Sequence, residues 1–204
     1  MKKCGKLAAG VLVAAMLLSG CGQAAVPEVI VEPTLVIDSD GRVTAYLVGE
    51  FDKSYYDLSE LTAMAREEAA EFSDTSQDGT VPVTVKSVEA AQDGSSRIVL
   101  AYQFDSTDSY KGFIGNELFY GTVEDALSKG YIQDVILQSV KSEATLVRET
   151  LEEQKEKHLI ITDAAAVIYC PERVTYLSAG AVMKEDGSVD ASKAPGIVYI
   201  LLRK

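Results

Sequence analysis

Asp-Gly dipeptides between short apolar runs are the feature that most narrows the folds open to this chain. Asp followed by Gly favours the tight turns of β-hairpins, because both residues tolerate positive φ angles. The dipeptide occurs at residues 40–41, 78–79, 93–94 and 186–187. Such turns join antiparallel strands, whereas parallel strands need long crossover connections. The pattern therefore predicts a mainly antiparallel sheet.

Hydrophobic periodicity adds helices to this sheet. Strands are expected at 34–37, 42–48, 81–90, 97–104, 131–140, 158–162, 166–169, 174–177, 181–184 and 197–202. Helices are expected at 59–72 and 122–129, with Ser59 and Thr122 as N-terminal caps and Gly130 as a C-terminal stop. Residues 106–118 are expected to form a short helix or a turn segment, and residues 143–157 have the composition of a helix. The polar end of the last helix is expected to be exposed and mobile. These elements predict an α+β fold in which helices pack on one face of the sheet.

The N-terminus has the pattern of a secretory signal peptide. Three lysines within the first six residues precede an apolar run from Leu7 to Leu18. Twelve helical residues extend only about 18 Å, whereas a bilayer core of about 30 Å needs roughly 20. The run is therefore too short to be a permanent span and has the length of a signal-peptide core.

The sequence Leu18-Ser19-Gly20-Cys21 at the end of this run resembles the bacterial lipobox. The resemblance implies that a diacylglycerol is attached to the Cys21 thiol and that a signal peptidase cuts just before it. The alternative is an ordinary signal peptide in which Cys21 has no role. We expect residues 1–20 to be a lipoprotein signal peptide, 21–33 a tether and 34–204 one globular domain. The location expected is the outer face of the bacterial cytoplasmic membrane.

Charge and cysteine usage restrict the partners and the chemistry. The net charge is −12, and removal of residues 1–20 takes away three lysines and no acid, which makes it −15. An anionic protein does not suit non-specific nucleic-acid binding, so no nucleic acid is expected. Cys170 would be the sole unmodified cysteine after processing, and it is expected to be buried and unreactive. The sequence has no glycine-rich phosphate loop or dinucleotide motif, and no cofactor is expected.

Several residues were considered for catalysis, and none is assigned to it. Cys170 and His158 are the only thiol–imidazole pair left after processing, but Cys170 follows an apolar strand as a core residue does. Paired helix carboxylates are required by glycoside hydrolases, and two groups have the spacing. These are Glu67, Glu68 and Glu71, and Glu149, Glu152, Glu153 and Glu156. Charge runs of this kind are usually solvated helix faces.

Two segments resemble a calcium-binding loop and a nucleic-acid-binding loop but lack the residues that these functions need. The segment 38–41 starts like a calcium loop, but Arg42 and Gly49 stand where oxygen ligands are needed. No metal is therefore expected. The GXXG segment 112–115 lacks the positive surroundings of a nucleic-acid loop. Aromatic residues near strand–helix junctions are expected mainly in the core, and they are where a ligand site would be sought. They are Tyr55, Tyr56, Tyr110, Phe119 and Tyr120.

Three stretches of the mature chain resemble uncharacterised lipoproteins of clostridial Gram-positive bacteria. They are FDKSYYDLSEL (51–61), ELFYGTVEDALSKGY (117–131) and VTYLSAGAV (174–182). The resemblance implies the same envelope location and no particular activity. The leading hypothesis is a lipid-anchored, non-enzymatic envelope protein that binds a protein partner or a small ligand. The alternative is an extracytoplasmic hydrolase that uses Asp or Glu carboxylates.

Overall fold

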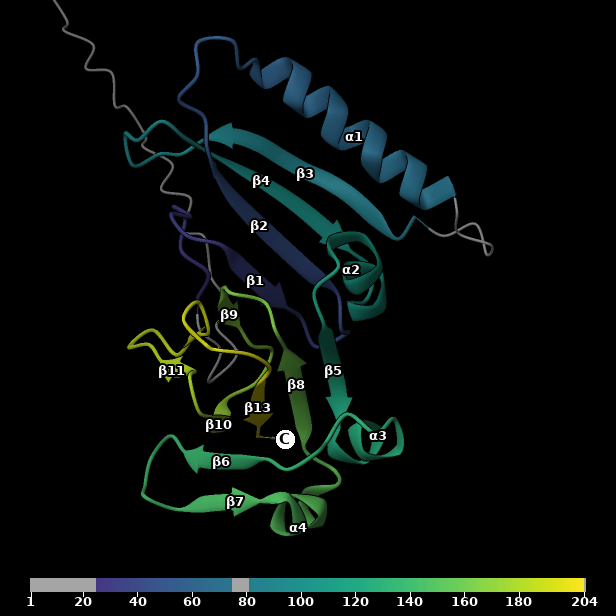
Figure 1. The fold of residues 1–204 in the computed structure, drawn as a ribbon, viewed down its shortest axis with the longest axis vertical. Helices are drawn as coiled ribbons and strands as arrows, with labels where there is room; N and C mark the ends of the chain where they lie inside the picture. The colour runs from purple at the N-terminus through teal and green to yellow at the C-terminus, as the bar shows by residue number, and fades with distance from the viewer. Residues whose placement is uncertain (1–24, 75–80, 204) are drawn as a thin grey trace, which may run out of the picture.

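Two β-sheets that share a hydrophobic core form the centre of the fold (Figure 1). The computed structural model describes residues 25–74 and 81–203. The first sheet has the order β11 (Val182–Met183), β12 (Val189–Asp190), β9 (Val167–Tyr169), β1 (Thr34–Ile37), β2 (Val43–Glu50), β4 (Arg97–Phe104) and β3 (Val83–Ala90). The second has the order β5 (Leu118–Thr122), β8 (His158–Thr162), β13 (Val198–Leu202), β10 (Val174–Ser178), β6 (Ile136–Ser139) and β7 (Thr145–Val147). Strands β1 and β9 run parallel, and the other pairs in the described ranges are antiparallel. The predicted α+β class and antiparallel pairing are confirmed.

The Asp-Gly turns join neighbouring strands as predicted. Gly41 between β1 and β2 has φ of +80°, and Gly94 between β3 and β4 has φ of +78°. In the first turn, Asp38 Oδ1 accepts hydrogen bonds of 2.9 Å from the backbone N–H groups of both Asp40 and Arg42. A third Asp-Gly pair joins β11 to β12, while residues 78–79 lie outside the described residues.

Helix α1 (Leu58–Asp74) lies along β3 on one face of the first sheet (Figure 1). Its start differs from the prediction, because Asp57 and not Ser59 caps it. Asp57 Oδ1 accepts from the backbone N–H groups of Ser59 at 2.7 Å and Glu60 at 3.0 Å. The helix buries Ala65 and Ala69, whose small side chains allow close approach to the sheet.

The segment 106–118, expected as a short helix or a turn segment, contains a short helix. Helix α2 (Thr107–Ile114) ends at Gly115, which has φ of +89°, and the chain then enters β5. The N-terminus of α3 (Val123–Ser128) is confirmed, because Thr122 and Asp125 form a reciprocal capping box. The predicted stop at Gly130 is also confirmed by its φ of +71°.

The predicted helix 143–157 is wrong over most of its length. The segment forms β7, one turn of helix α4 (Arg148–Leu151) and a 3-10 turn, η1 (Glu152–Gln154). Pairing of β7 with β6 in a hairpin supplies backbone hydrogen bonds that outweigh the local helix propensity. Leu151 is fully buried, so the segment is attached to the core through this side chain.

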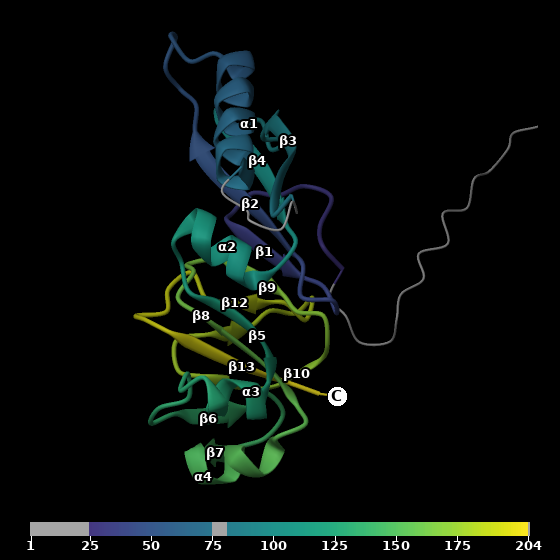
Figure 2. The same ribbon diagram turned by 90° about the vertical axis from the view of Figure 1, so that its right-hand side faces the viewer.

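Two hydrophobic clusters stabilise the arrangement. The first lies between the sheets and contains Ile37, Phe104, Ile160 and Ile200, with α1 and α2 packed at its upper end (Figures 1 and 2). The second lies on the opposite face of the second sheet, under α3 and α4, and is built around Leu159 and other residues of the same face. The second sheet is therefore buried on both faces, which accounts for the nearly continuous apolar sequence of β8 and β13.

Candidate ligand-binding site

Four cationic side chains line one cavity at an edge of the second sheet. They are Lys141, Lys157, Arg173 and Arg203, and we call the space that they line the basic cavity. Its volume is about 450 Å³, and its remaining walls come from Ser139, Val140, Val174, Thr175 and Tyr176. No acidic residue contributes to this lining.

Strand direction explains why the four cations meet. Lys157 directly precedes β8, Arg173 directly precedes β10, Arg203 directly follows β13, and Lys141 comes two residues after β6. Because β8, β13, β10 and β6 are successively antiparallel, these four strand ends lie at one edge of the sheet. Figure 1 shows this edge beside the C-terminus, where β13 ends.

Backbone hydrogen bonds hold this edge of the sheet in register. The N–H of Arg203 donates to the carbonyl of Arg173 at 2.8 Å, which places these two arginines on neighbouring strands. The N–H of Val140 donates to the carbonyl of Thr175 at 3.0 Å and fixes the start of the segment that carries Lys141. The cationic side chains therefore extend from a rigid frame.

The four cations of the basic cavity differ from many other cations of the described residues in lacking an ion-pair partner. Within residues 25–74 and 81–203, none of the four cations forms an ion pair. Many other cations are paired with carboxylates, as Lys111 is with Glu117 at 2.7 Å. Like charges held close together repel one another, so an anion in this cavity would relieve an unfavourable interaction. In a chain of net charge −12, this concentration of positive charge suits the capture of an anion.

The single histidine lies on the reverse face of the same strands. His158 Nδ1 is in close contact with Glu172 Oε1, and Tyr120 Oη lies 3.3 Å from that nitrogen. Tyr120 Oη also donates to Glu172 Oε1 at 3.4 Å, and its pKa is raised to about 12 by burial and by the Glu172 carboxylate. His158 follows Lys157 and Glu172 precedes Arg173 in the sequence. The contact therefore ties together the two segments that carry two of the cavity cations.

The structure gives Cys170 no role in catalysis. It is buried in the core between the sheets, and burial raises the pKa of its thiol to about 12. A nucleophilic cysteine needs a lowered thiol pKa, which favours the reactive thiolate. No hydrogen bond joins it to His158, whose Nδ1 contacts Glu172. The expected burial of Cys170 is confirmed.

The two carboxylate groups that the hydrolase alternative considers lie in different parts of the fold. Glu67, Glu68 and Glu71 line a groove of about 380 Å³ beside Leu100 and Tyr102, and Glu68 accepts a hydrogen bond of 3.5 Å from Tyr102 Oη. The group 149–156 does not share a helix face, because α4 ends at Leu151. Glu152 pairs with Arg148 at 3.1 Å.

The carboxyl pKa values that are displaced among the described residues are lowered, whereas a general acid at neutral pH needs a raised value. Asp93 is the largest example, because hydrogen bonds from Ser95 and Arg97 lower its pKa to about 2. The carboxyl pKa values of Asp57 and Asp125 are lowered by the hydrogen bonds that these side chains accept at their helix caps. These carboxylates stabilise turns and helix starts.

The aromatic residues considered for binding do not form one site. Tyr55 and Tyr56 lie exposed in the loop before α1, and Tyr110 is buried in the core. Phe119 packs against Tyr131 on the other face of the second sheet, with ring centroids 5.2 Å apart. Tyr120 alone of this group contacts a titratable cluster, the pair His158 and Glu172.

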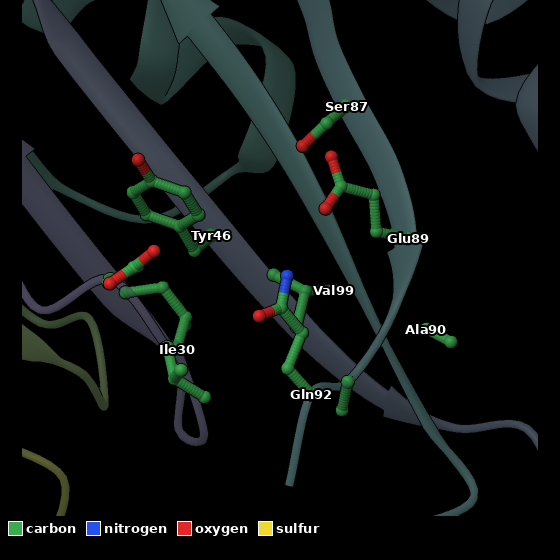
Figure 3. A pocket seen from close by; sticks show the side chains of 10 residues that line it. Ile30, Tyr46, Ser87, Glu89, Ala90, Gln92 and Val99 are labelled. Atoms are coloured by element: carbon green, nitrogen blue, oxygen red, sulfur yellow. The ribbon is translucent and has the colours of Figure 1, made fainter. Parts of the chain in front are cut away.

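The segment before β1 is packed against the first sheet. Residues 28–30 close a hollow of about 80 Å³ with Tyr46, Glu89 and their neighbours (Figure 3). Arg97 Nη1 donates to the carbonyl of Val31 at 2.7 Å, and Lys184 Nζ pairs with Glu32 at 2.8 Å. This hollow has room for a few water molecules, and it lies where residues 28–30 pack against the first sheet.

Cys21, the predicted lipidation site, lies outside the described residues. Among the described residues, no helix has the length and apolar character needed to cross a bilayer. In the same part of the chain, no three His, Cys, Asp or Glu side chains gather to hold a metal ion. The segment 112–115 forms the end of α2 and its cap.

Sequence reasoning missed the basic cavity. Its four cations are separated by 16 to 30 residues, and none belongs to a motif. The available signal was their common position at strand ends, but the order of the strands was needed to bring them together. No protein-family model matches the chain, and no curated protein or solved structure matches it.

Proposed function

We propose that this chain is a lipid-anchored protein on the outer face of the bacterial cytoplasmic membrane that binds a small anionic ligand without catalysis. The basic cavity carries the binding part of the proposal, because four unpaired cations line it and no carboxylate does. The lipobox sequence that ends at Cys21 supports the anchor and the location. Anchoring by two acyl chains is stable, since each buried CH₂ contributes about 0.8 kcal/mol.

Binding is tested by thermal unfolding of the full chain in uncharged detergent, with citrate as the probe. An anion that binds only the folded protein stabilises it by about 2.7 kcal/mol at 100 times its Kd. The stabilisation is expected to fall as ionic strength rises, because salt screens the attraction. Replacing both arginines (Arg173→Gln with Arg203→Gln) should abolish most of it.

The control variant removes the same charge elsewhere. Arg66→Gln with Lys86→Gln changes two exposed cations outside the basic cavity and should leave the stabilisation by citrate unchanged. Equal losses in both double variants would show a general charge effect and would contradict a site at Arg173 and Arg203. No stabilisation of the unmodified chain by any small anion would refute the binding function itself.

Anchoring is tested separately by Cys21→Ser in a bacterial host. The serine hydroxyl is a much poorer nucleophile than the cysteine thiol, so this variant should incorporate no labelled fatty acid. Its signal segment should also remain uncut. Cys170→Ser, in which a buried thiol is changed, is the matched control and should be lipidated normally. A mature N-terminus other than residue 21 in the unmodified protein would overturn the assignment.

A further inference from the structure

The composition of the basic cavity indicates more than a negative charge on the ligand. This inference rests on the proposed function, since it concerns the ligand of the same cavity. Two of the four cations are arginines on adjacent strands, joined by the backbone bond of 2.8 Å from Arg203 N to Arg173 O. Arginine presents a planar fork of N–H donors that matches two oxygens of a phosphate or carboxylate. The pair therefore provides two forks in the lining of the cavity.

The number of cations favours phosphate over a single carboxylate. A carboxylate carries one charge, whereas a phosphate monoester carries about −1.5 to −2 at neutral pH, with three strong acceptor oxygens. Lys141 and Lys157 add point charges beside the arginine pair. Ser139 and Thr175 also belong to this lining, although the Thr175 hydroxyl donates to the carbonyl of Leu201 at 2.9 Å. A tetrahedral group with several acceptor oxygens can engage more of these donors than a planar carboxylate.

The size and apolar walls indicate that the phosphate is attached to an organic group. A volume of about 450 Å³ lies within the range of 300–1,000 Å³ found for organic ligands. Inorganic phosphate, with five heavy atoms, would fill a small part of it. Val140, Val174 and the ring of Tyr176 supply an apolar wall next to the cations.

We propose that the basic cavity binds an organic phosphate ester. The phosphate lies against Arg173 and Arg203, flanked by the two lysines, and the organic part lies against Val140, Val174 and Tyr176. Two sources supply this chemistry: a soluble phosphate ester and the headgroup of an anionic phospholipid. Figure 2 shows the N-terminal segment (purple) and the C-terminal end of β13 on the same side of the molecule, so membrane lipid is a source to be tested.

The test compares probes by calorimetry on the full chain in uncharged detergent. Glycerol phosphate is expected to bind at least about 10-fold more tightly than acetate, inorganic phosphate or citrate, although citrate carries more charge. Arg173→Lys with Arg203→Lys keeps the charge but removes both forks, and should reduce this preference by about 10-fold. The control variant, Lys141→Arg with Lys157→Arg, also keeps the charge and should preserve the preference for glycerol phosphate.

The source is decided by adding dihexanoylphosphatidylglycerol below its micelle concentration. Tighter binding of this lipid than of glycerol phosphate identifies a headgroup, and the reverse identifies a soluble ester; both orders uphold the phosphate site. Citrate binding as tightly as glycerol phosphate would overturn the phosphate inference and leave the anion-binding function intact. Absence of binding by every anion would refute both.

Discussion

The buried thiol of Cys170 offers a test of the core between the sheets. Burial raises its pKa from 9.0 to about 12. At pH 8, about one-tenth of an exposed thiol with the lower value is ionised, against about one part in 10,000 in the folded protein. Because the thiolate is the reactive form, alkylation in the native state should be about 1,000-fold slower than in the unfolded chain.

The assay follows iodoacetamide labelling by mass spectrometry, with and without concentrated urea. Cys4→Ser and Cys21→Ser in the background leave Cys170 as the only thiol. If the folded protein is labelled only through transient unfolding, the native rate will be slower still, which also agrees with a buried thiol. A native rate within about 10-fold of the urea rate would show that the thiol is accessible and that the core around it is wrongly described.

The same pKa difference predicts how stability depends on pH. The folded value exceeds the unfolded value, so the contribution of the neutral Cys170 thiol is complete below pH 9. It is lost as pH rises from 9 to 12, by about 4 kcal/mol in total for a difference of three pH units. Tyrosines with raised pKa values also titrate there, and comparison with Cys170→Ala isolates the thiol. Equal pH dependence of the two proteins would contradict the argument.

Two further predictions concern segments whose packing was not evident from the sequence. Leu151→Ala should reduce the free energy of unfolding in urea by about 2–5 kcal/mol, because it empties a fully buried site. The control, Glu153→Ala at a neighbouring exposed position, should change that free energy by less than about 0.5 kcal/mol. A similarly small effect of both substitutions would show that the segment is not attached to the core. A chain that starts at Thr34 should melt several degrees below one that starts at residue 25, because it lacks buried Ile30 and the ion pair from Glu32 to Lys184. Identical melting temperatures would show that the segment before β1 does not contribute.

Local sequence signals predicted those parts of the fold that local interactions determine. The hairpins at Gly41 and Gly94 need a positive φ angle, and the capping box of Thr122 and Asp125 lies within one turn, so both were visible as short patterns. The segment 145–147 was predicted as helix because its pairing with β6 depends on backbone hydrogen bonds that composition does not encode. The parallel pairing of β1 with β9 joins segments more than 130 residues apart, so the division into two sheets was not predictable.

The candidate site depends entirely on such distant pairings. Lys157 and Arg173 meet Arg203 only because β13 lies between β8 and β10 in the second sheet. The sequence alone drew attention to His158 as the single histidine, and the structure places it behind the basic cavity in contact with Glu172. Glu172 had no distinguishing pattern and could not have been selected.

If Cys21 carries the proposed lipid, the packed segment before β1 limits how far the fold can move from the membrane. Residues 28–30 lie against the sheet, so a lipid on Cys21 would be at most seven residue steps from the fold, an upper limit of about 25 Å. The folded part of the protein would therefore remain within a thin layer above the bilayer surface. Ligands of the anchored protein would have to diffuse into that layer. A second protein anchored in the same leaflet would meet it by two-dimensional diffusion, at a far higher encounter frequency than a soluble partner in the bulk medium.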